Sequence, residues 1–387
     1  MRSNLNFFSD QKFRSLFYQI LVVGLFAFGL YYLMTTTAYN LEKRNIATGW
    51  RFLSNPAGFD ISFSPFLDYK ATDTHLKVYF VGLLNTLLIS FCGCIAATIL
   101  GFIVGVMRLS SNWLLSKTAY CYVEFCRNIP LILQIILWYT ILLQMPLIKQ
   151  SKEIGKGFFV TNRGLYSPRP IYEEGFGIVF VVFILTVIAS FFIRRWSKKR
   201  QETTGQQFPV LWTSLSLIVF LPLIVFFISG SPMSLGYPAL KGFNFKGGMV
   251  IRPEFIAMFL ALSIYTGAFI SETVRSGILS VTKGQREASG ALGLKPNWVM
   301  RLIVIPQALR VIVPPLTSQY LNLTKNSSLG IVVGYADLVH GFGGISLNQT
   351  GQAIECMVIV MATYLTISLI ISLFMNIYNR SIQFKEK

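Results

Sequence analysis

Long stretches without a charged residue are the feature that most constrains how this chain can fold. Seven such runs occupy residues 16–39, 78–107, 128–148, 176–193, 209–230, 255–270 and 357–378. An eighth, 309–333, is weaker because it contains Arg310, Pro314, Pro315 and Lys325. A bilayer core requires about 20 apolar residues in a helix and disfavours charge at its centre. The runs therefore predict an all-α, polytopic membrane protein with about eight transmembrane helices.

Composition excludes the commonest soluble classes. The 387 residues are 53% hydrophobic and 13% charged, whereas soluble domains carry roughly 25% charge. A net charge of +18 would suggest nucleic acid in a soluble protein, but the cations here lie mostly between apolar runs. They are better explained by membrane topology and contact with anionic lipids. The five cysteines lie mainly in apolar runs and predict neither a disulfide framework nor a metal site.

The distribution of Lys and Arg predicts the orientation. The first run follows Lys12 and Arg14 and exceeds the roughly 7 to 15 apolar residues of a signal peptide, so we expect a retained helix. A dense cationic cluster at 194–200 marks an inside segment. Both termini are then cytoplasmic, as Arg2, Lys385 and Lys387 also favour. The outside segments are 40–77, 149–175, 231–251 and a glycine-rich loop at 341–344.

A short stretch between two apolar runs carries the most information. In residues 276–301, Gly284 is expected to end one helix, and the period of Glu287 and its neighbours predicts a short helix that Gly293 and Pro296 terminate. A stiff cytoplasmic helix flanked by breakers is suited to passing force from a soluble partner to the membrane. An ordinary amphipathic loop on the lipid headgroups fits the physics equally well.

The residues of this stretch resemble a known motif. Glu287-Ala288-Ser289, Gly293 and Ile303-x-Ile305-Pro306 are similar to the EAA loop of ABC importer permeases, with departures at Ser289 and Ile305. Further matching segments are 124–131, 265–268, 284–288, 291–294, 306–310, 314–316 and 322–329. Together they resemble the permeases of the polar amino acid (histidine, glutamate, glutamine, arginine) uptake family.

The resemblance implies a domain organisation. The five-helix core of the type I ABC importer permease fold would occupy 78–148 and 252–387. Residues 1–77 would add an N-terminal helix and a periplasmic loop, and 149–251 would insert two helices. This enlarged form resembles the larger permease of the general L-amino acid importers, which works beside a second, related permease chain. The family's minimal permease starts outside and ends inside, as the cation distribution also predicts.

The resemblance also implies partners and roles. The chain lacks G-x-x-x-x-G-K-[ST], so no cofactor is expected on it, and ATP and Mg would bind a separate ATPase subunit. That ATPase would receive the coupling residues Glu287, Ala288, Ser289, Gly293 and Pro306. A periplasmic binding protein would deliver the amino acid at the bacterial inner membrane. The chain itself would be a transport subunit and not an enzyme.

Charges within the runs indicate a possible substrate path. Lys325 lies in a polar segment after two prolines, where a broken helix could line a cavity, with Asn322 and Glu272 as further candidates. A salt bridge between Lys325 and Glu272, or between Glu272 and Arg275, is the structural alternative. A secondary transporter driven by an ion gradient would instead use Glu272 and Glu355. A non-transporting scaffold is the third possibility, and neither of these classes requires an EAA loop.

Overall fold

The computed structural model describes residues 11–43 and 48–383. The termini on which part of the orientation rests, including Arg2, Lys385 and Lys387, lie outside the described residues. The chain divides into two compact units. The first comprises Met1–Ile136 with Met258–Lys387, and the second comprises Leu137–Ala257.

Helices dominate both units, as predicted. Within the described residues, seven helices are long and apolar enough to cross a membrane, or eight if one bent helix pair counts as a span. The seven are α1 (Gln11–Lys43), α2 (His75–Met107), α5 (Phe176–Thr204), α6 (Val210–Ile228), α7 (Pro253–Leu279), a composite run Pro296–Val333 and α12 (Ala353–Ile382). The prediction of an all-α protein with about eight spans is confirmed.

The bent pair differs from the predicted third span. Helix α3 (Trp113–Asn128) and helix α4 (Leu131–Leu143) meet at 106°, so a straight span over 128–148 is wrong. Pro130 causes the break, because proline lacks an N–H and disfavours helical geometry in the preceding residue. Ile129 is accordingly extended, with φ −102° and ψ 127°. A search for charge-free runs missed α3 because that helix is amphipathic.

The composite run Pro296–Val333 is helical throughout, although it contains several kinds of helix. It joins α9 (Pro296–Val299), a π-helical turn (Met300–Val304), α10 (Ile305–Asn326) and a 3₁₀ segment (Ser327–Val333). Helix α10 continues through Pro314 and Pro315 and ends at Asn326, within the polar segment 322–328, where the 3₁₀ segment begins. Both prolines are exposed. Membrane helices tolerate the backbone hydrogen bonds that such prolines remove.

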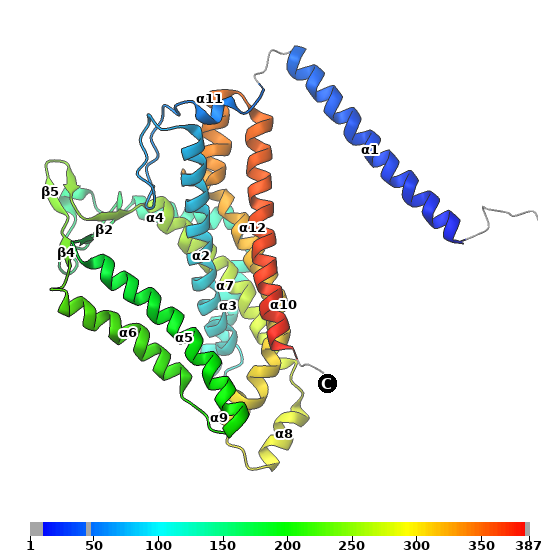
Figure 1. Cartoon of the computed structure of the whole chain (residues 1–387), viewed down its shortest axis with the longest axis vertical. Helices are drawn as coiled ribbons and strands as arrows, with labels where there is room; N and C mark the ends of the chain where they lie inside the picture. The colour runs from blue at the N-terminus through cyan, green and yellow to red at the C-terminus, as the bar shows by residue number, and fades with distance from the viewer. Residues whose placement is uncertain (1–10, 44–47, 384–387) are drawn as a thin grey trace, which may run out of the picture. The chain divides into compact units, whose positions relative to one another are not determined.

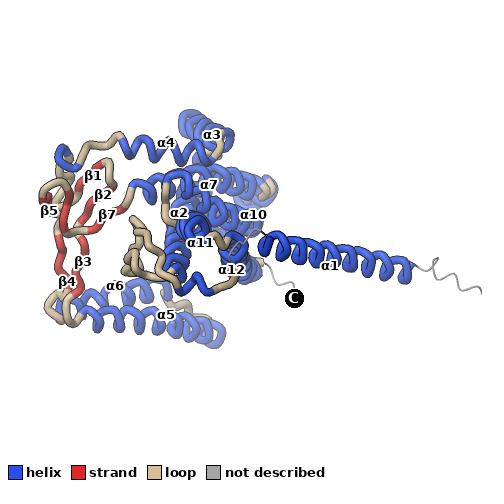
Figure 2. Tube along the Cα trace, turned by 90° about the horizontal axis from the view of Figure 1, so that it is seen from above, coloured by secondary structure: helices blue, strands red, loops and turns tan. Residues whose placement is uncertain are grey.

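Close helix packing organises the first unit. Helices α2, α10 and α12 run side by side (Figures 1 and 2). Helix α2 also approaches α7 at Gly101 and Gly105. A Cβ atom at Gly105 would lie 2.8 Å from the backbone oxygen of Ser271, and one at Gly101 would lie 2.5 Å from Ile270 Cγ2. Small residues at such crossings let membrane helices come into backbone contact.

The segment between the composite run and α12 is helical, so the prediction of a glycine-rich loop at 341–344 is wrong. It forms a π-helical turn, η6 (Leu338–Ser346), followed by α11 (Leu347–Thr350). Gly341 and Gly343 are buried within η6. A Cβ at Gly82 of α2 would lie 2.9 Å from the Cα of Leu338. Gly82 therefore allows α2 to approach the backbone of η6 closely, and Gly343 of η6 faces Val360 of α12.

The second unit combines a helical hairpin with small sheets. Helices α5 and α6 pack against each other, and their side chains are largely exposed. The strands are β1 (Phe159–Thr161), β2 (Gly164–Ser167), β3 (Arg169–Tyr172), β4 (Met233–Gly236), β5 (Ala239–Lys241), β6 (Asn244–Lys246) and β7 (Met249–Ile251). All pairings are antiparallel, in the orders β1-β2-β7, β3-β4 and β5-β6. Two segments treated separately in the sequence thus fold together (Figure 2); we name residues 144–175 and 231–252 the β-platform.

Candidate functional site

The predicted short helix between two spans is present as α8 (Lys283–Ala291). Gly293 ends it in the left-handed region, with φ +76°. The Leu294 N–H donates to the Ser289 carbonyl at 3.2 Å, which closes the helix end as a Schellman motif does. Gly284 lies inside α8, and the preceding helix already ends at Leu279. Its predicted role as a terminator is therefore wrong.

Helix α8 is fastened to the end of α7. The Arg286 guanidinium donates to the Ile278 carbonyl at 2.7 Å. Ser289, the departure from the family motif, is buried, and its hydroxyl donates to the Gln285 carbonyl at 2.5 Å. The extra oxygen relative to alanine is thus satisfied by the helix itself. A displacement of α8 would therefore reach α7 through the Arg286 contact.

The outer side of the α8–α9 tip is exposed and mixed in character. Glu287 and Ala288 are exposed on α8. Glu287 makes no hydrogen bond or ion pair with any part of the chain that the structure describes. Leu292 is 82% exposed and Trp298 is 51% exposed, although both are large apolar side chains. Exposed apolar groups beside an unengaged carboxylate are typical of a protein contact surface.

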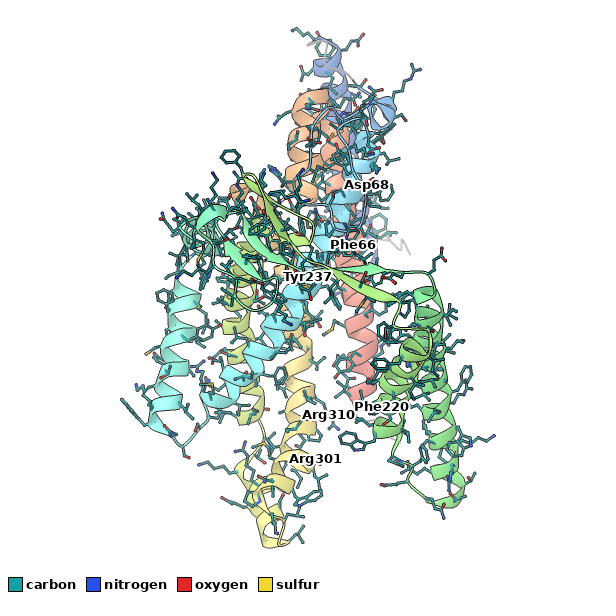
Figure 3. All side chains as sticks on the ribbon, turned by 90° about the vertical axis from the view of Figure 1, so that its left-hand side faces the viewer. Phe66, Asp68, Phe220, Tyr237, Arg301 and Arg310 are labelled. Carbon is teal, nitrogen blue, oxygen red and sulfur yellow. The ribbon has the colours of Figure 1, made fainter. Side chains whose placement is uncertain are left out.

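The tip continues directly into the membrane run. Pro306 is half-buried near the start of α10, directly after the π-helical turn. Arg301 and Arg310 lie along this part of the run (Figure 3). The Arg310 Nε donates to the Ile382 carbonyl at 2.9 Å, which joins α10 to the end of α12. The predicted coupling residues therefore lie on α8, on the turn after it and at the start of α10, which follow one another along the chain.

Glu272 joins two helices. Its carboxylate pairs with Arg275 at 2.6 Å along α7 and also with Arg108, which follows the end of α2. The predicted Glu272–Arg275 pair is confirmed, and the alternative pair between Glu272 and Lys325 is wrong. Lys325 is on α10 and forms no ion pair within the described residues, and both oxygens of Glu272 already accept from arginines. Glu272 thus ties α2 to α7.

Lys325 and Asn322 instead share an exposed face of α10. Ser318, Asn322 and Lys325 are exposed and lie about one helical turn apart. Leu323 and Thr324, between them in sequence, are buried. The face with the polar side chains therefore points away from the core of the first unit. This geometry is compatible with a path lined by more than one chain.

A buried polar cluster, which the sequence did not reveal, surrounds the segment before η6. The Asn85 amide donates to the carbonyls of Phe63 and Ala336, each at 2.8 Å. The Tyr335 hydroxyl donates to the Asn85 carbonyl at 2.9 Å. The Leu338 N–H donates to the Thr86 hydroxyl at 3.1 Å. These bonds fix α2, the loop before it and the η6 segment to one another.

Asp337 is the charged member of this cluster. It is fully buried, its Oδ1 accepts from the His340 N–H at 2.8 Å, and the Tyr364 hydroxyl lies 3.3 Å from its Oδ2. Burial raises the pKa of this carboxyl to about 7, against the lowering effect of the backbone donors. The only signal in the sequence is one acid flanked by apolar residues.

The buried Asp337 carboxyl predicts that the stability of the protein depends on pH. Its folded pKa exceeds the unfolded value of 3.8, so its contribution to stability is complete below that value and is lost as the pH rises to about 7. The loss approaches about 4 kcal/mol by the usual conversion of pKa into free energy. We expect Asp337→Asn, which can still cap η6, to flatten the decline of the melting temperature in detergent between pH 5 and 8.

The exposed Asp68 provides the matched control, because Asp68→Asn removes a carboxyl that is already solvated (Figure 3). That variant should keep the wild-type slope of melting temperature against pH. Equal slopes for wild type and Asp337→Asn would show that the buried carboxyl does not titrate in this range.

Comparison with known proteins agrees with this architecture. The sequence profile of the family described as "Binding-protein-dependent transport system inner membrane component" matches residues 203–384. The general L-amino acid transport system permease protein AapQ of Rhizobium johnstonii is 48% identical, over 98% of this chain and 94% of its own length. The putative amino-acid ABC transporter permease protein YhdX of Escherichia coli is 45% identical, over 98% and 97%.

A third relative, the glutamate/glutamine/aspartate/asparagine transport system permease protein BztB of Rhodobacter capsulatus, is 44% identical over 98% of this chain and 96% of its own length. These similarities extend over both units and include the α1 region and the β-platform. The resemblance drawn from the EAA-like residues is therefore confirmed. The chain belongs to the family of binding-protein-dependent transport system inner membrane components and is a multi-pass, non-catalytic permease subunit of an ABC importer.

Proposed function

We propose that this permease carries amino acids, polar or broad-range L-amino acids, across the bacterial inner membrane as part of an ATP-driven importer. The observation that carries the proposal is the exposed α8–α9 tip, which is anchored to α7 and continuous with α10. The names of three relatives that match nearly the whole chain support the substrate class.

A separate ATPase subunit drives the cycle in this proposal, and it binds ATP and Mg. Its surface receives Glu287, Ala288 and the exposed apolar side chains of the tip. Closure of two ATPase subunits displaces α8. The Arg286 contact passes this motion to α7, and the helical run from Pro296 passes it to α10, so that access alternates between the two sides.

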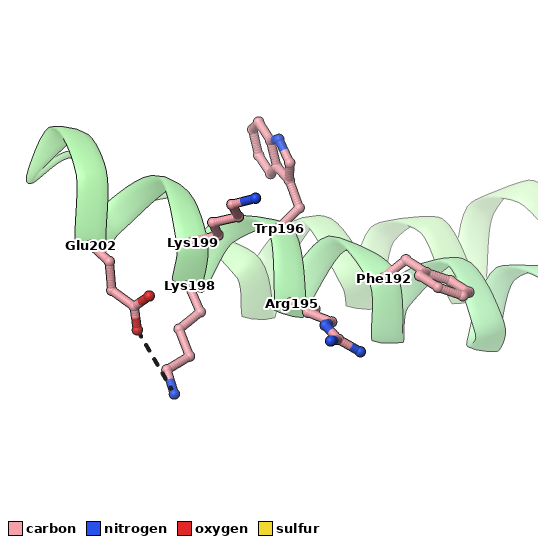
Figure 4. A pocket seen from close by; sticks show the side chains of 6 residues that line it. All are labelled: Phe192, Arg195, Trp196, Lys198, Lys199 and Glu202. Atoms are coloured by element: carbon pink, nitrogen blue, oxygen red, sulfur yellow. Dashed lines mark ion pairs between the residues drawn. The ribbon is translucent and has the colours of Figure 1, made fainter.

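The proposed orientation places the α8–α9 tip and both termini in the cytoplasm. We assign the end of α5 to the cytoplasm as well, because it carries Arg195, Lys198 and Lys199 close in sequence to Trp196 (Figure 4). The Arg200 guanidinium lies 5.3 Å from the centre of the Trp196 ring. Cations mixed with tryptophan are typical of the cytoplasmic membrane interface. The β-platform, at the opposite end of the α5–α6 hairpin, is then periplasmic.

The substrate path in this proposal runs along the polar face of α10. The Lys325 ammonium would meet a substrate carboxylate, with Asn322 one turn away. Glu272 is assigned to the joint between α2 and α7. A second, related permease chain would supply the opposite wall, and a periplasmic binding protein would deliver the amino acid.

The acids required by an ion-gradient mechanism are both engaged. Glu272 is held by two arginines. Glu355, in the first turn of α12, accepts from the Gly49 N–H at 2.6 Å. Neither carboxylate is arranged as an open proton or sodium site, and the comparisons support the ABC importer instead.

Purification of the tagged chain from its native membrane tests the proposal. After solubilisation in mild detergent, quantitative mass spectrometry should find an ATP-binding subunit and a second permease in stoichiometric amounts. The purified complex should hydrolyse ATP faster when a loaded binding protein is added. A stable chain that purifies alone would contradict the proposal.

A further inference from the structure

The β-platform carries a strong excess of positive charge on residues outside the hairpin helices. It contains three acids, Glu153, Glu173 and Glu174. It contains eight cations: Lys149, Lys152, Lys156, Arg163, Arg169, Lys241, Lys246 and Arg252. Seven of these are exposed, and none forms an ion pair within the described residues. An excess of this kind opposes the positive-inside tendency if the platform is periplasmic, so it requires another explanation.

A small polar pocket lies at the centre of this charge. It has a volume of about 270 Å³ and is enclosed by the β1–β2 turn, the β6–β7 turn and the residue after β7. Arg163 enters from the first turn, and its guanidinium donates to Asn244 Oδ1. Arg252 enters from the end of β7. Both guanidinium groups thus line one cavity built from segments that are about 90 residues apart.

One hydrogen-bond donor of the Arg252 guanidinium has no acceptor in the described residues. Its Nε is enclosed and has no hydrogen-bond partner among the described residues. An enclosed guanidinium N–H without an acceptor is costly, so the site lacks an anionic or carbonyl acceptor. The backbone restricts the pocket further: Gly248 has φ +65°, and a Cβ there would lie 2.7 Å from the Ser167 carbonyl oxygen. The β6–β7 turn therefore packs tightly on β2 at this wall of the pocket, and only glycine fits there.

The chemistry of the pocket favours a carboxylate. A guanidinium presents parallel N–H donors that match the two oxygens of a carboxylate. The volume lies below the usual range of about 300 to 1,000 Å³ for small-molecule sites, which favours an inserted side chain. The surrounding cations favour a partner with many acids, and they would steer its approach.

We propose that the β-platform docks an acidic face of the periplasmic substrate-binding protein, which inserts an Asp or Glu carboxylate between Arg163 and Arg252. The inference rests on the proposed function and orientation, because it requires the platform to face the periplasm. Arg252 contacts the carboxylate with its guanidinium group from one wall of the pocket, and Arg163, positioned by Asn244, contacts it from the other side. The outer lysines and Arg169 contribute attraction at longer range.

The test measures binding of the purified binding protein to the full transporter complex in nanodiscs, by biolayer interferometry. Arg163→Gln and Arg252→Gln should each weaken the affinity roughly tenfold, and the double variant roughly 100-fold. Raising the salt from about 50 to about 500 mM should weaken the wild type more than the double variant. The exposed Lys241, on β5 and outside the pocket, gives the matched control Lys241→Gln, with a change of twofold or less.

Further readouts separate the possible failures. ATP hydrolysis without binding protein, and the melting temperature of the complex, should be unchanged in Arg163→Gln. Wild-type affinity in the double variant would overturn the docking site while leaving the importer assignment intact. No binding of the protein to the wild-type complex would instead contradict the proposed function. Binding of a free amino acid that Arg252→Gln abolishes, without binding protein present, would assign the pocket to substrate and overturn the proposal.

Exchanging the charges of Arg252 and its proposed partner acid would give direct evidence for the contact. Arg252→Glu should abolish binding of the wild-type binding protein. A binding-protein variant in which one surface acid is replaced by lysine should restore it. Restoration by a lysine at only one surface position would identify the inserted carboxylate, and failure at every acid of the docking face would refute the insertion.

Discussion

Glu287→Lys should abolish uptake while the permease still folds. The Glu287 side chain is exposed and makes no hydrogen bond or ion pair within the described residues, so its reversal costs the isolated chain little. At an interface, a like-charge contact costs several kcal/mol, which corresponds to a loss of roughly 100-fold or more in affinity. Uptake of labelled amino acid, the amount of co-purified ATPase and the melting temperature should be measured together. We expect the first two to fall and the third to stay constant.

Glu202→Lys is the matched control for this variant. Glu202 is also an exposed glutamate, at the end of α5, and its ion pair with Lys198 is long, at 3.9 Å, and solvated (Figure 4). Such pairs contribute little to stability, so uptake should remain near the wild-type level. Normal uptake by Glu287→Lys would remove the carboxylate from the coupling surface. A shared loss in both variants would indicate a general sensitivity to charge on that side of the membrane.

The sequence predicted the spans well where one physical property decides the structure. Runs such as 78–107 and 357–378 carry no charge, and desolvation of the backbone in lipid leaves few alternatives to a helix. The EAA-like helix was also predictable, because Gly293 supplies the left-handed residue that its end requires. In each case the deciding interaction is local, and the residue types state it directly.

Features that depend on contacts between distant segments were not predictable. The β-platform forms because β2 pairs with β7 across the α5–α6 hairpin, a contact that neither loop indicates alone. The glycines of η6 resemble a flexible loop in the sequence, but Gly341 and Gly343 are buried in a helical segment that packs on α2 and α12. The effect of a proline on a helix was predictable at one site and not at another. Pro130 separates two helices, whereas Pro314 and Pro315 lie within one, because the exposed face of α10 accommodates their rings.

The residues of the candidate site show the same difference between local and long-range interactions. Glu287 and its neighbours were found because their residue types and spacing resemble the EAA motif. Asp337 was missed because one acid in an apolar segment does not reveal which partners bury it. The pairing of Glu272 with Arg275 followed from their one-turn separation, but Arg108 joins them only because α2 and α7 cross at glycines. The partner suggested for Glu272 on α10 was wrong for lack of that information.

Lys325→Met should lower uptake of an amino acid at least tenfold without preventing assembly. The ammonium lies on an exposed face of α10 with Asn322 and makes no ion pair among the described residues. Its removal therefore leaves no buried acid unpaired in this chain. A hydrogen bond to a charged group contributes about 1.5 to 3 kcal/mol, so losing a contact to the substrate carboxylate gives about a tenfold effect or more. Uptake should be measured in proteoliposomes with co-purified partners, beside ATP hydrolysis without substrate.

Lys325→Arg tests whether the charge or the shape of the side chain matters. Arginine keeps the positive charge and the long apolar stem, so it should restore most of the uptake if the cation meets a carboxylate. Substrate-independent ATP hydrolysis should be the same in wild type, Lys325→Met and Lys325→Arg, because no coupling contact is altered. If Lys325→Met transports at the wild-type rate, the polar face of α10 does not carry the substrate. If it loses its partner subunits instead, the same face is an interface between permease chains, and Lys325 acts there through assembly and not through substrate.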